Sequence, residues 1–231
     1  MTGPVALVGS GEYTPAMLEV DRLLLEGRAP RYVQIPTAAA PEGQASLDKW
    51  IGMGIAHAES LGVQPVSLVV RHRDDAGDPE LVKQLEGAGL IYFSGGDPHY
   101  LTETFRDTPM WTAIVEAWHD GAALGGCSAG AMAFGGWVPS VRRPMGAGRQ
   151  GLGLLPNVCV LPHFDRYFGR LPGLAMRALV RTGEGITTVG VDEDTALVGG
   201  PDEFTVMGKA SAWVIKGSHR VLVRTGETIR L

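Results

Sequence analysis

Short apolar runs alternate with longer amphipathic stretches over the first half of the chain. Runs rich in β-branched and other apolar residues predict strands at 4–9, 31–37, 63–70, 90–97 and 122–128. Stretches with apolar residues at helical spacing predict helices at 16–27, 46–62, 78–89 and 109–121. Ser46 is the expected N-cap of the second helix, and Asp78, followed by Pro79, is the expected N-cap of the third. This order predicts an α/β fold with a mostly parallel, doubly wound sheet and helices on both faces.

The pattern changes in the last third of the chain. Strand-rich segments with closely spaced turns occupy residues 185–200 and 203–231. They predict antiparallel strands near the C-terminus. No Pro/Ser-rich linker, charge block or internal repeat divides the sequence, so we expect a single α/β domain over residues 1–231.

Composition and charge narrow the classes of partner. Hydrophobic residues make up 45% and charged residues 19% of the 231 positions, the balance of a globular protein. The net charge of -5 argues against nucleic acid, because phosphate binding normally requires a basic excess. Two cysteines, Cys127 and Cys159, are too few for a disulfide framework or a four-thiolate zinc site. The sequence shows neither a signal-peptide pattern nor a long apolar run, so we expect a cytoplasmic protein without a membrane partner. The assembly state stays open, with a homodimer as one candidate.

The stretch LGGCSAGAMAF places Cys127 beside Ser128 at the end of the strand predicted over residues 122–128. Ligand sites in open α/β sheets lie at the carboxyl ends of the strands. Centred on Ser128, the stretch matches the G-x-S-x-G nucleophile elbow, with Gly126 and Gly130 in the flanking positions. Centred on Cys127, it has Ala129 where the second glycine should stand. The glycine register therefore favours Ser128 as the nucleophile and makes Cys127 a small packing residue.

A reactive serine needs a base and preorganised donors for the oxyanion. Among the six histidines, His163 is the first candidate base, because it follows the apolar run NVCVLP at a strand end. His99, in SGGDPHY, is the second choice and is better suited to contact the substrate. The same stretch supplies glycine amides at a strand end, so we expect the amides of Gly96 and Ala129 to form the oxyanion hole.

Several stretches occur together and in the order typical of one known family. They are IPTAAAPEG, IYFSGGDPHYL, GGCSAGAMAF, GLGLLPNVCVLPHFDRYFGRL and GVDEDTALVGG. In these stretches the sequence resembles the serine peptidase family of dipeptidase E and cyanophycinase, whose fold is similar to that of class I glutamine amidotransferases. The resemblance implies Ser128 as nucleophile, His163 as base, and oxyanion donors from the SGGD loop and Ala129. It also implies hydrolysis of small acidic peptides, such as dipeptides with N-terminal aspartate or the aspartate–arginine polymer cyanophycin.

The sequence departs from this family where the third triad residue is expected. That residue is usually an Asp or Glu between the serine and the histidine, but residues 121–164 contain no acidic side chain. Asp165 is the first candidate, because His163 and Asp165 would project to the same side of a strand. Glu193 and Asp194 are the next candidates. Without an orienting acid the activity would be weak, since changing that residue costs roughly 10⁴-fold in rate.

Basic residues near the expected site favour an acidic ligand. Arg142, Arg143 and Arg149 follow the elbow, and Arg166 and Arg170 flank the base. A guanidinium binds a carboxylate through two parallel hydrogen bonds. The residues expected to contact the substrate are Asp97, His99, Arg166, Arg170 and Glu193. No metal or organic cofactor is expected, because the sequence has no H-x-x-x-H pair and no C-x-x-C motif.

Three hypotheses follow. The leading one is a serine hydrolase in which Ser128 attacks a peptide carbonyl and His163 transfers the proton. The second is an amidotransferase-like or deglycase-like enzyme that uses Cys127. The third is a non-catalytic binding protein that kept the pocket after losing the triad acid.

Overall fold

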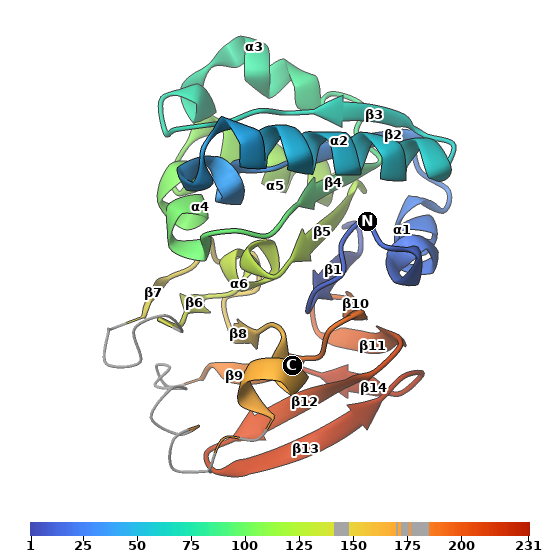
Figure 1. Ribbon diagram of the computed structural model, residues 1–231, viewed down its shortest axis with the longest axis vertical. Coiled ribbons are helices and arrows are strands. Elements are labelled where there is room, and N and C mark those ends of the chain that lie inside the picture. Colours follow the sequence, from blue (N-terminus) through green and yellow to red (C-terminus); the bar gives the residue numbers. More distant parts are fainter. Residues whose placement is uncertain (141–147, 170, 172–175, 177–184) are drawn as a thin grey trace.

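The computed structural model describes residues 1–140, 148–169, 171, 176 and 185–231. Its larger sheet has eight strands: β1 (Val5–Val8), β2 (Arg31–Ile35), β3 (Gln64–Ser67), β4 (Leu90–Phe93), β5 (Ala123–Cys127), β10 (Thr195–Gly199), β11 (Glu203–Gly208) and β14 (Thr228–Arg230). Their order is β14-β11-β10-β1-β5-β4-β2-β3 (Figure 1). The strands from β1 to β3 in this order are parallel, whereas β10, β11 and β14 pair antiparallel.

A second sheet lies at the end of the molecule opposite helix α3 (Pro79–Val82) (Figure 1). It contains β8 (Val158–Leu161), β9 (Thr187–Val191), β12 (Ser211–Lys216) and β13 (His219–Arg224), in the order β13-β12-β9-β8. The pair β8–β9 is parallel, and the other two pairs are antiparallel. A short hairpin of β6 (Trp137–Val138) and β7 (Arg149–Gln150) completes the strands of the described residues.

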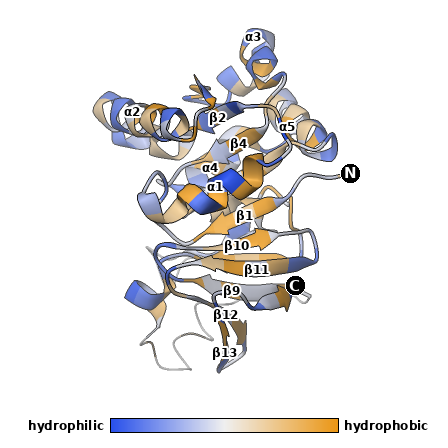
Figure 2. Cartoon of the chain, turned by 90° about the vertical axis from the view of Figure 1, so that its right-hand side faces the viewer, coloured by the Kyte–Doolittle hydropathy of each residue, from blue (hydrophilic) through white to orange (hydrophobic). Residues whose placement is uncertain are grey.

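Helices cover both faces of the larger sheet. Besides α3, they are α1 (Leu18–Leu25), α2 (Gln44–Ser60), α4 (Pro98–Phe105), α5 (Pro109–His119) and α6 (Ala129–Phe134). Short 3-10 helices occupy Pro15–Met17, Thr37–Glu42, Asp75–Gly77 and Lys83–Leu85, and a π-helical turn, η5, occupies Phe164–Phe168. Figure 2 shows α2 and α5 on opposite sides of the sheet, whose strands are largely hydrophobic.

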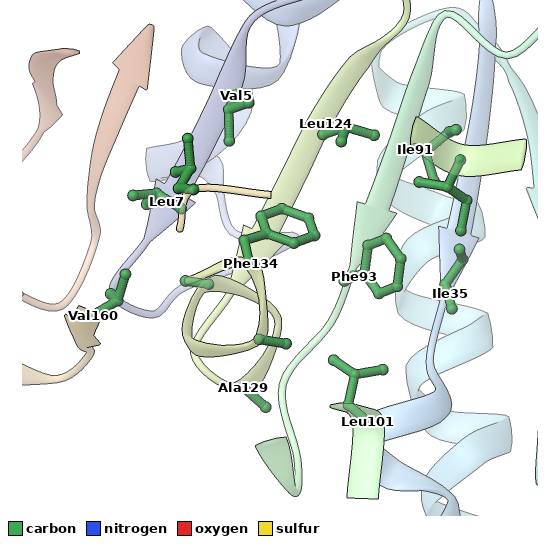
Figure 3. Packing of buried hydrophobic residues seen from close by; sticks show 14 of the residues in the cluster. Val5, Leu7, Ile35, Ile91, Phe93, Leu101, Leu124, Ala129, Phe134 and Val160 are labelled. Atoms are coloured by element: carbon green, nitrogen blue, oxygen red, sulfur yellow. The ribbon is translucent and has the colours of Figure 1, made fainter. Parts of the chain in front are cut away.

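The alternation of side chains along the strands builds one core on each face of the larger sheet. In β1, Val5 and Leu7 enter the core shared with α4, α5 and α6, whereas Ala6 and Val8 enter the core under α1 and α2. Figure 3 shows the first core, with Phe134 of α6 directed toward the sheet. A fully buried Phe side chain of this kind contributes about 1.5–3 kcal/mol. Through these contacts the core anchors α6, the helix that begins next to the predicted nucleophile.

The predicted α/β class is confirmed, together with the parallel strands and the antiparallel C-terminal pairing. Asp78 caps α3 as predicted, because its side chain accepts a hydrogen bond from the Glu80 amide. The predicted N-cap at Ser46 is wrong: α2 begins at Gln44, and the Ser46 hydroxyl donates to Glu42 instead, at 2.6 Å. Helix α4 was not predicted at all.

Candidate active site

Gly9 joins the two sheets at the place where their strand ends meet. Its amide donates to the Thr195 carbonyl at 2.9 Å, and its carbonyl accepts from the His163 amide at 3.3 Å. A Cβ at position 9 would lie 2.1 Å from the Asp192 carbonyl oxygen, so a side chain would push the two segments apart. This close crossing brings the carboxyl ends of β8 and β9 beside those of β1, β4 and β5.

Ser128 follows β5 at a sharp turn into α6. Its backbone has φ 49° and ψ -104°, a conformation that costs a non-glycine residue on the order of 1–3 kcal/mol. Its amide donates to the Val8 carbonyl at 2.9 Å. The flanking glycines are required by close packing: a Cβ at Gly126 would lie 2.7 Å from the Gly130 carbonyl carbon, and a Cβ at Gly130 would lie 2.4 Å from the Phe93 carbonyl oxygen. The turn has the geometry of a nucleophile elbow with Ser128 at its apex.

The imidazole of His163 lies against this serine. The distance from Ser128 Oγ to His163 Nε2 is 3.1 Å, within reach of a general base. His163 has left-handed backbone angles, φ 50° and ψ 40°, and its carbonyl accepts from the amides of Arg166 and Tyr167 at 3.2 and 3.0 Å. The Tyr167 ring packs edge-on against the imidazole at 5.7 Å between centroids. Backbone and ring contacts together fix the position of the imidazole.

The acid on the other side of the imidazole is Glu193. Its Oε1 lies 2.8 Å from His163 Nδ1. The prediction that Asp165 fills this place is wrong, because Asp165 Oδ1 accepts instead from the backbone amide of Glu193, at 3.0 Å. The prediction assumed that residues 163–165 form a strand. His163 is left-handed and the next residues form the π-helical turn η5, so side chains two apart do not share a face here.

The environment of Glu193 favours its ionised form. The hydrogen bond from His163 lowers the pKa of this carboxyl below its usual value, and the Arg166 guanidinium lowers that pKa further. Arg166 Nη1 lies 3.4 Å from the same Oε1. A carboxylate at Nδ1 holds the ring proton there and leaves Nε2 free to accept the proton of Ser128.

Strained backbone is concentrated at these strand ends. Tyr13, Ser128, His163 and Asp194 have φ values of 65°, 49°, 50° and 52°. Among the described residues, Asp107 is the one other non-glycine residue with positive φ, at 55°. Strain of this kind persists where the surrounding structure fixes it, and it clusters at functional sites.

Cys127 differs from Ser128 in every respect that matters for a nucleophile. It is fully buried under α1 and α2, and its Sγ donates to Glu12 Oε2 at 2.7 Å. Burial raises the pKa of this thiol well above its usual value, and the nearby carboxylate of Glu12 raises that pKa further. Because the thiolate is the reactive form of cysteine, this geometry does not suit Cys127 to nucleophilic attack.

In the loop after β4, the Gly96 amide has no acceptor among the described residues. On either side of Gly96, the Gly95 amide donates to Glu12 Oε1 at 2.9 Å and the Asp97 amide donates to a backbone carbonyl at 2.7 Å. Within the described part of the chain, neither the Gly96 amide nor the Ala129 amide donates a hydrogen bond. Both amides are therefore free to bind an oxyanion.

The other residues that were predicted to contact the substrate lie in different surroundings. Asp97 is the N-cap of α4, where its Oδ1 accepts from the amides of His99 and Tyr100 at 2.9 and 3.0 Å. The structure thus shows Asp97 as a helix cap, and its contact with the substrate stays a prediction. His99 lies in the first turn of α4, and burial lowers the pKa of its imidazole. Its role stays a prediction. Arg166 lies beside Glu193, and Arg170 falls outside the described residues.

Of the three arginines that follow the elbow, the structure describes Arg149. Arg149 forms an ion pair with Glu103 of α4. Arg142 and Arg143 lie outside the described residues. Of the arginines expected to favour an acidic ligand, Arg166 is the one that the described structure places beside Glu193 and His163.

Two solved structures resemble this fold. The crystal structure of a peptidase from an acI-B1 Actinobacterium matches with a TM-score of 0.91 and 41% identity, covering 100% of this chain and 98% of that one. A putative peptidase E from Listeria monocytogenes EGD-e matches with a TM-score of 0.59 and 17% identity, covering 98% and 100%. The second likeness concerns the fold alone.

The sequence comparisons define the family. Residues 5–207 match the sequence model of peptidase family S51, and the chain belongs to this family. The cyanophycinases of Synechococcus elongatus and Thermosynechococcus vestitus are 32% identical over 165 residues, which cover 67% of this chain and 50% of each relative. The chain therefore spans about half the length of these curated relatives. The family predicted from the sequence motifs is confirmed.

The helices give no sign of a membrane span. In the part of the chain that the structure describes, no helix combines the length and the hydropathy needed to cross a bilayer.

Proposed function

We propose that this protein is a serine peptidase in which Ser128, His163 and Glu193 form the catalytic triad. The observation that carries the proposal is the pair of contacts on the imidazole, 3.1 Å to Ser128 Oγ and 2.8 Å to Glu193 Oε1. Membership in a peptidase family supports the same class of reaction. The hypothesis of a non-catalytic binding protein rested on a missing triad acid. With Glu193 as that acid, this reason for a non-catalytic protein no longer applies.

The triad geometry leads to an acyl-enzyme mechanism. Ser128 Oγ attacks the carbonyl carbon of the scissile peptide, and its proton passes to His163 Nε2. The Glu193 carboxylate stabilises the imidazolium, while the amides of Gly96 and Ala129 donate to the oxyanion. His163 then protonates the leaving nitrogen and the C–N bond breaks. A water molecule that gives its proton to His163 hydrolyses the ester and restores Ser128.

We infer that the substrates are small peptides with an aspartyl residue at the cleaved bond. Arg166 supports this inference, because its side chain is 62% exposed beside the triad and can form charge-assisted hydrogen bonds with a carboxylate. The family resemblance and the similarity to two cyanophycinases support it as well.

A panel of peptides tests the triad proposal. Aspartyl dipeptides and β-aspartyl-arginine are incubated with the wild type, Ser128→Ala and His163→Ala, and the released amino acids are quantified. We expect turnover of at least one acidic peptide by the wild type and a loss of at least about 10³-fold in each variant. Full activity in both variants would refute the mechanism.

A second comparison tests the acidic substrate. Arg166→Gln removes the guanidinium, and the kcat/KM for an aspartyl dipeptide is compared with that for the matching asparaginyl dipeptide. Loss of a charged hydrogen bond is expected to lower the ratio of the two values by about tenfold. The asparaginyl peptide is the internal control, because any effect of Arg166 on Glu193 changes both rates equally. An unchanged ratio would exclude Arg166 from substrate selection.

A further inference from the structure

A buried carboxylate lies behind the loop that carries the Gly96 amide. Glu12 follows β1 and is only 7% exposed. Its Oε1 accepts from the Gly95 amide at 2.9 Å, and its Oε2 accepts from Cys127 Sγ at 2.7 Å. Through one side chain, the carboxyl ends of the three neighbouring strands β1, β4 and β5 are tied together.

Glu12 is close to the nucleophile without facing it. A Cβ at Gly95 would lie 2.9 Å from Glu12 Oε1 and 3.5 Å from Ser128 Cβ. Gly95 therefore lies between the Glu12 carboxylate and the elbow, with no room for a side chain. Each carboxylate oxygen already has a donor, Gly95 N for one and Cys127 Sγ for the other. Glu12 is therefore arranged as an anchor for its neighbours and not as a base for the substrate.

The anchor acts on the segment that presents the free amide. Gly95 N is fixed by Glu12, and Asp97 N is fixed by the Ala38 carbonyl at 2.7 Å. Between them, Gly96 has φ 143°, a region that glycine enters and leaves easily. Without the contact to Glu12, one of the two bonds that orient the Gly96 N–H would be lost.

We propose that Glu12 is a positioning residue for the oxyanion hole, with the Cys127 thiol holding its second carboxylate oxygen. The inference rests on the proposed function, because it takes the Gly96 amide as an oxyanion donor. Donors that are already oriented stabilise the transition state most, and they have little effect on binding of the ground state. The cysteine beside the nucleophile thus acts through Glu12 and performs no chemistry of its own.

Charge alone predicts the opposite effect. An anion near the oxyanion hole disfavours the negative charge that develops there, so removing Glu12 would then accelerate the reaction. Positioning predicts that Glu12→Ala slows the reaction. It also predicts that Glu12→Gln retains most of the rate, because the amide oxygen still accepts from Gly95 N. The two explanations can therefore be separated by the sign of the effect.

The experiment measures the second-order rate of labelling by a fluorophosphonate. Attack of Ser128 Oγ on phosphorus expels fluoride, and the phosphoryl oxygen takes the place of the oxyanion, so the probe reports on the hole without knowledge of the substrate. We expect labelling to be about 10- to 100-fold slower in Glu12→Ala, and within about threefold of the wild type in Glu12→Gln. The matched control is Asp21→Ala, which removes another buried carboxylate, one that hydrogen-bonds to His57 at 2.7 Å and to Tyr32 rather than to the Gly95 amide. It is expected to lower the melting temperature and to label at the wild-type rate.

A second pair of variants covers the case in which Glu12→Ala does not fold. Cys127→Val removes the donor to Glu12 Oε2 and is expected to slow labelling, and Cys127→Ser, which keeps a donor, should recover most of the lost rate. Equal or faster labelling in folded Glu12→Ala, or equal slowing in Asp21→Ala, would overturn the positioning role and leave Ser128 as the nucleophile. Failure of the wild type to be labelled at Ser128 would instead overturn the proposed function, and this inference with it.

Discussion

Replacing Glu193 by glutamine isolates the contribution of the acid that the structure places on the imidazole. The change keeps the size of the side chain and removes the carboxylate that accepts from His163 Nδ1 at 2.8 Å. A glutamine amide can present its NH₂ group to Nδ1, which favours the tautomer with the proton on Nε2. In that tautomer Nε2 can no longer accept the proton of Ser128.

The size of the effect follows from the exposure of the pair. In a buried Ser-His-Asp triad, the acid-to-amide exchange lowers kcat roughly 10⁴-fold. Here the side chains of Glu193 and His163 are 34% and 26% exposed, so water can partly replace the lost acceptor. We therefore expect kcat to fall about 10³-fold, which corresponds to about 4 kcal/mol of transition-state stabilisation.

The assay compares Glu193→Gln with Asp165→Asn under substrate saturation. Asp165 accepts from the Glu193 amide through one oxygen at 3.0 Å, and the side-chain oxygen of asparagine can do the same. Asp165→Asn should therefore keep kcat within about threefold of the wild type, since a neutral hydrogen bond replaces a charge-assisted one outside the triad. The assignment would be refuted if Glu193→Gln kept the wild-type kcat, or if Asp165→Asn lost more than Glu193→Gln.

Four further predictions concern the elbow, the two cysteines and the cap of α4. Gly130→Ala should lower both stability and activity, because its Cβ would lie 2.4 Å from the Phe93 carbonyl oxygen. Thermal melting measures the loss of stability, and peptide turnover measures the loss of activity. An unchanged melting temperature would contradict the close packing at Gly130. Iodoacetamide at pH 8 should leave Cys127 and Cys159 unmodified in the folded protein and alkylate both in urea, because burial raises the pKa of Cys127 well above its usual value and that of Cys159 to about 12. The pKa of Cys159 is raised on folding, so the unfolded chain loses this thiol proton at a lower pH than the folded protein does. The stability that the protonated thiol contributes is therefore complete below about pH 8.5 and is lost as the pH rises toward about 12. Denaturant unfolding across this pH range measures the loss. Asp97→Ala should cost about 0.5–2 kcal/mol of unfolding free energy through the lost helix cap, and a flat result in urea titration would show that the cap is dispensable.

The local rules that predicted most elements also explain the errors. The order of strands and helices follows from periodicity, and Asp78 with Pro79 marked the start of α3. The same Asp-Pro signal at Asp97 and Pro98 marks α4, but residues 90–97 were predicted as a strand and no helix was predicted after them. The Asp-Pro pair is visible in the sequence, but only the hydrogen bonds that Asp97 accepts show that a helix begins there.

The site depends on contacts that no local pattern encodes. Ser128 and His163 were predicted from their places after strands, because strand ends gather at one edge of a sheet. Glu193 could not be ranked above Asp165, because its place depends on how β9 crosses β1 at Gly9 and on the π-helical turn after His163. The parallel pairing of β8 with β9, and the close approach at Gly9, are long-range contacts. Gly9 and Glu12 both lie in the stretch GSGEY after β1. Its two glycines at a strand end are the sequence feature that pointed to this part of the site.

The most direct test of the central claim is to locate the fluorophosphonate label by peptide mapping. The account predicts one adduct, on Ser128 in the peptide that contains LGGCSAGAMAF, with none in Ser128→Ala and strongly slowed formation in His163→Ala. An adduct on another residue, or an unmodified Ser128 in folded wild-type protein, would contradict the account.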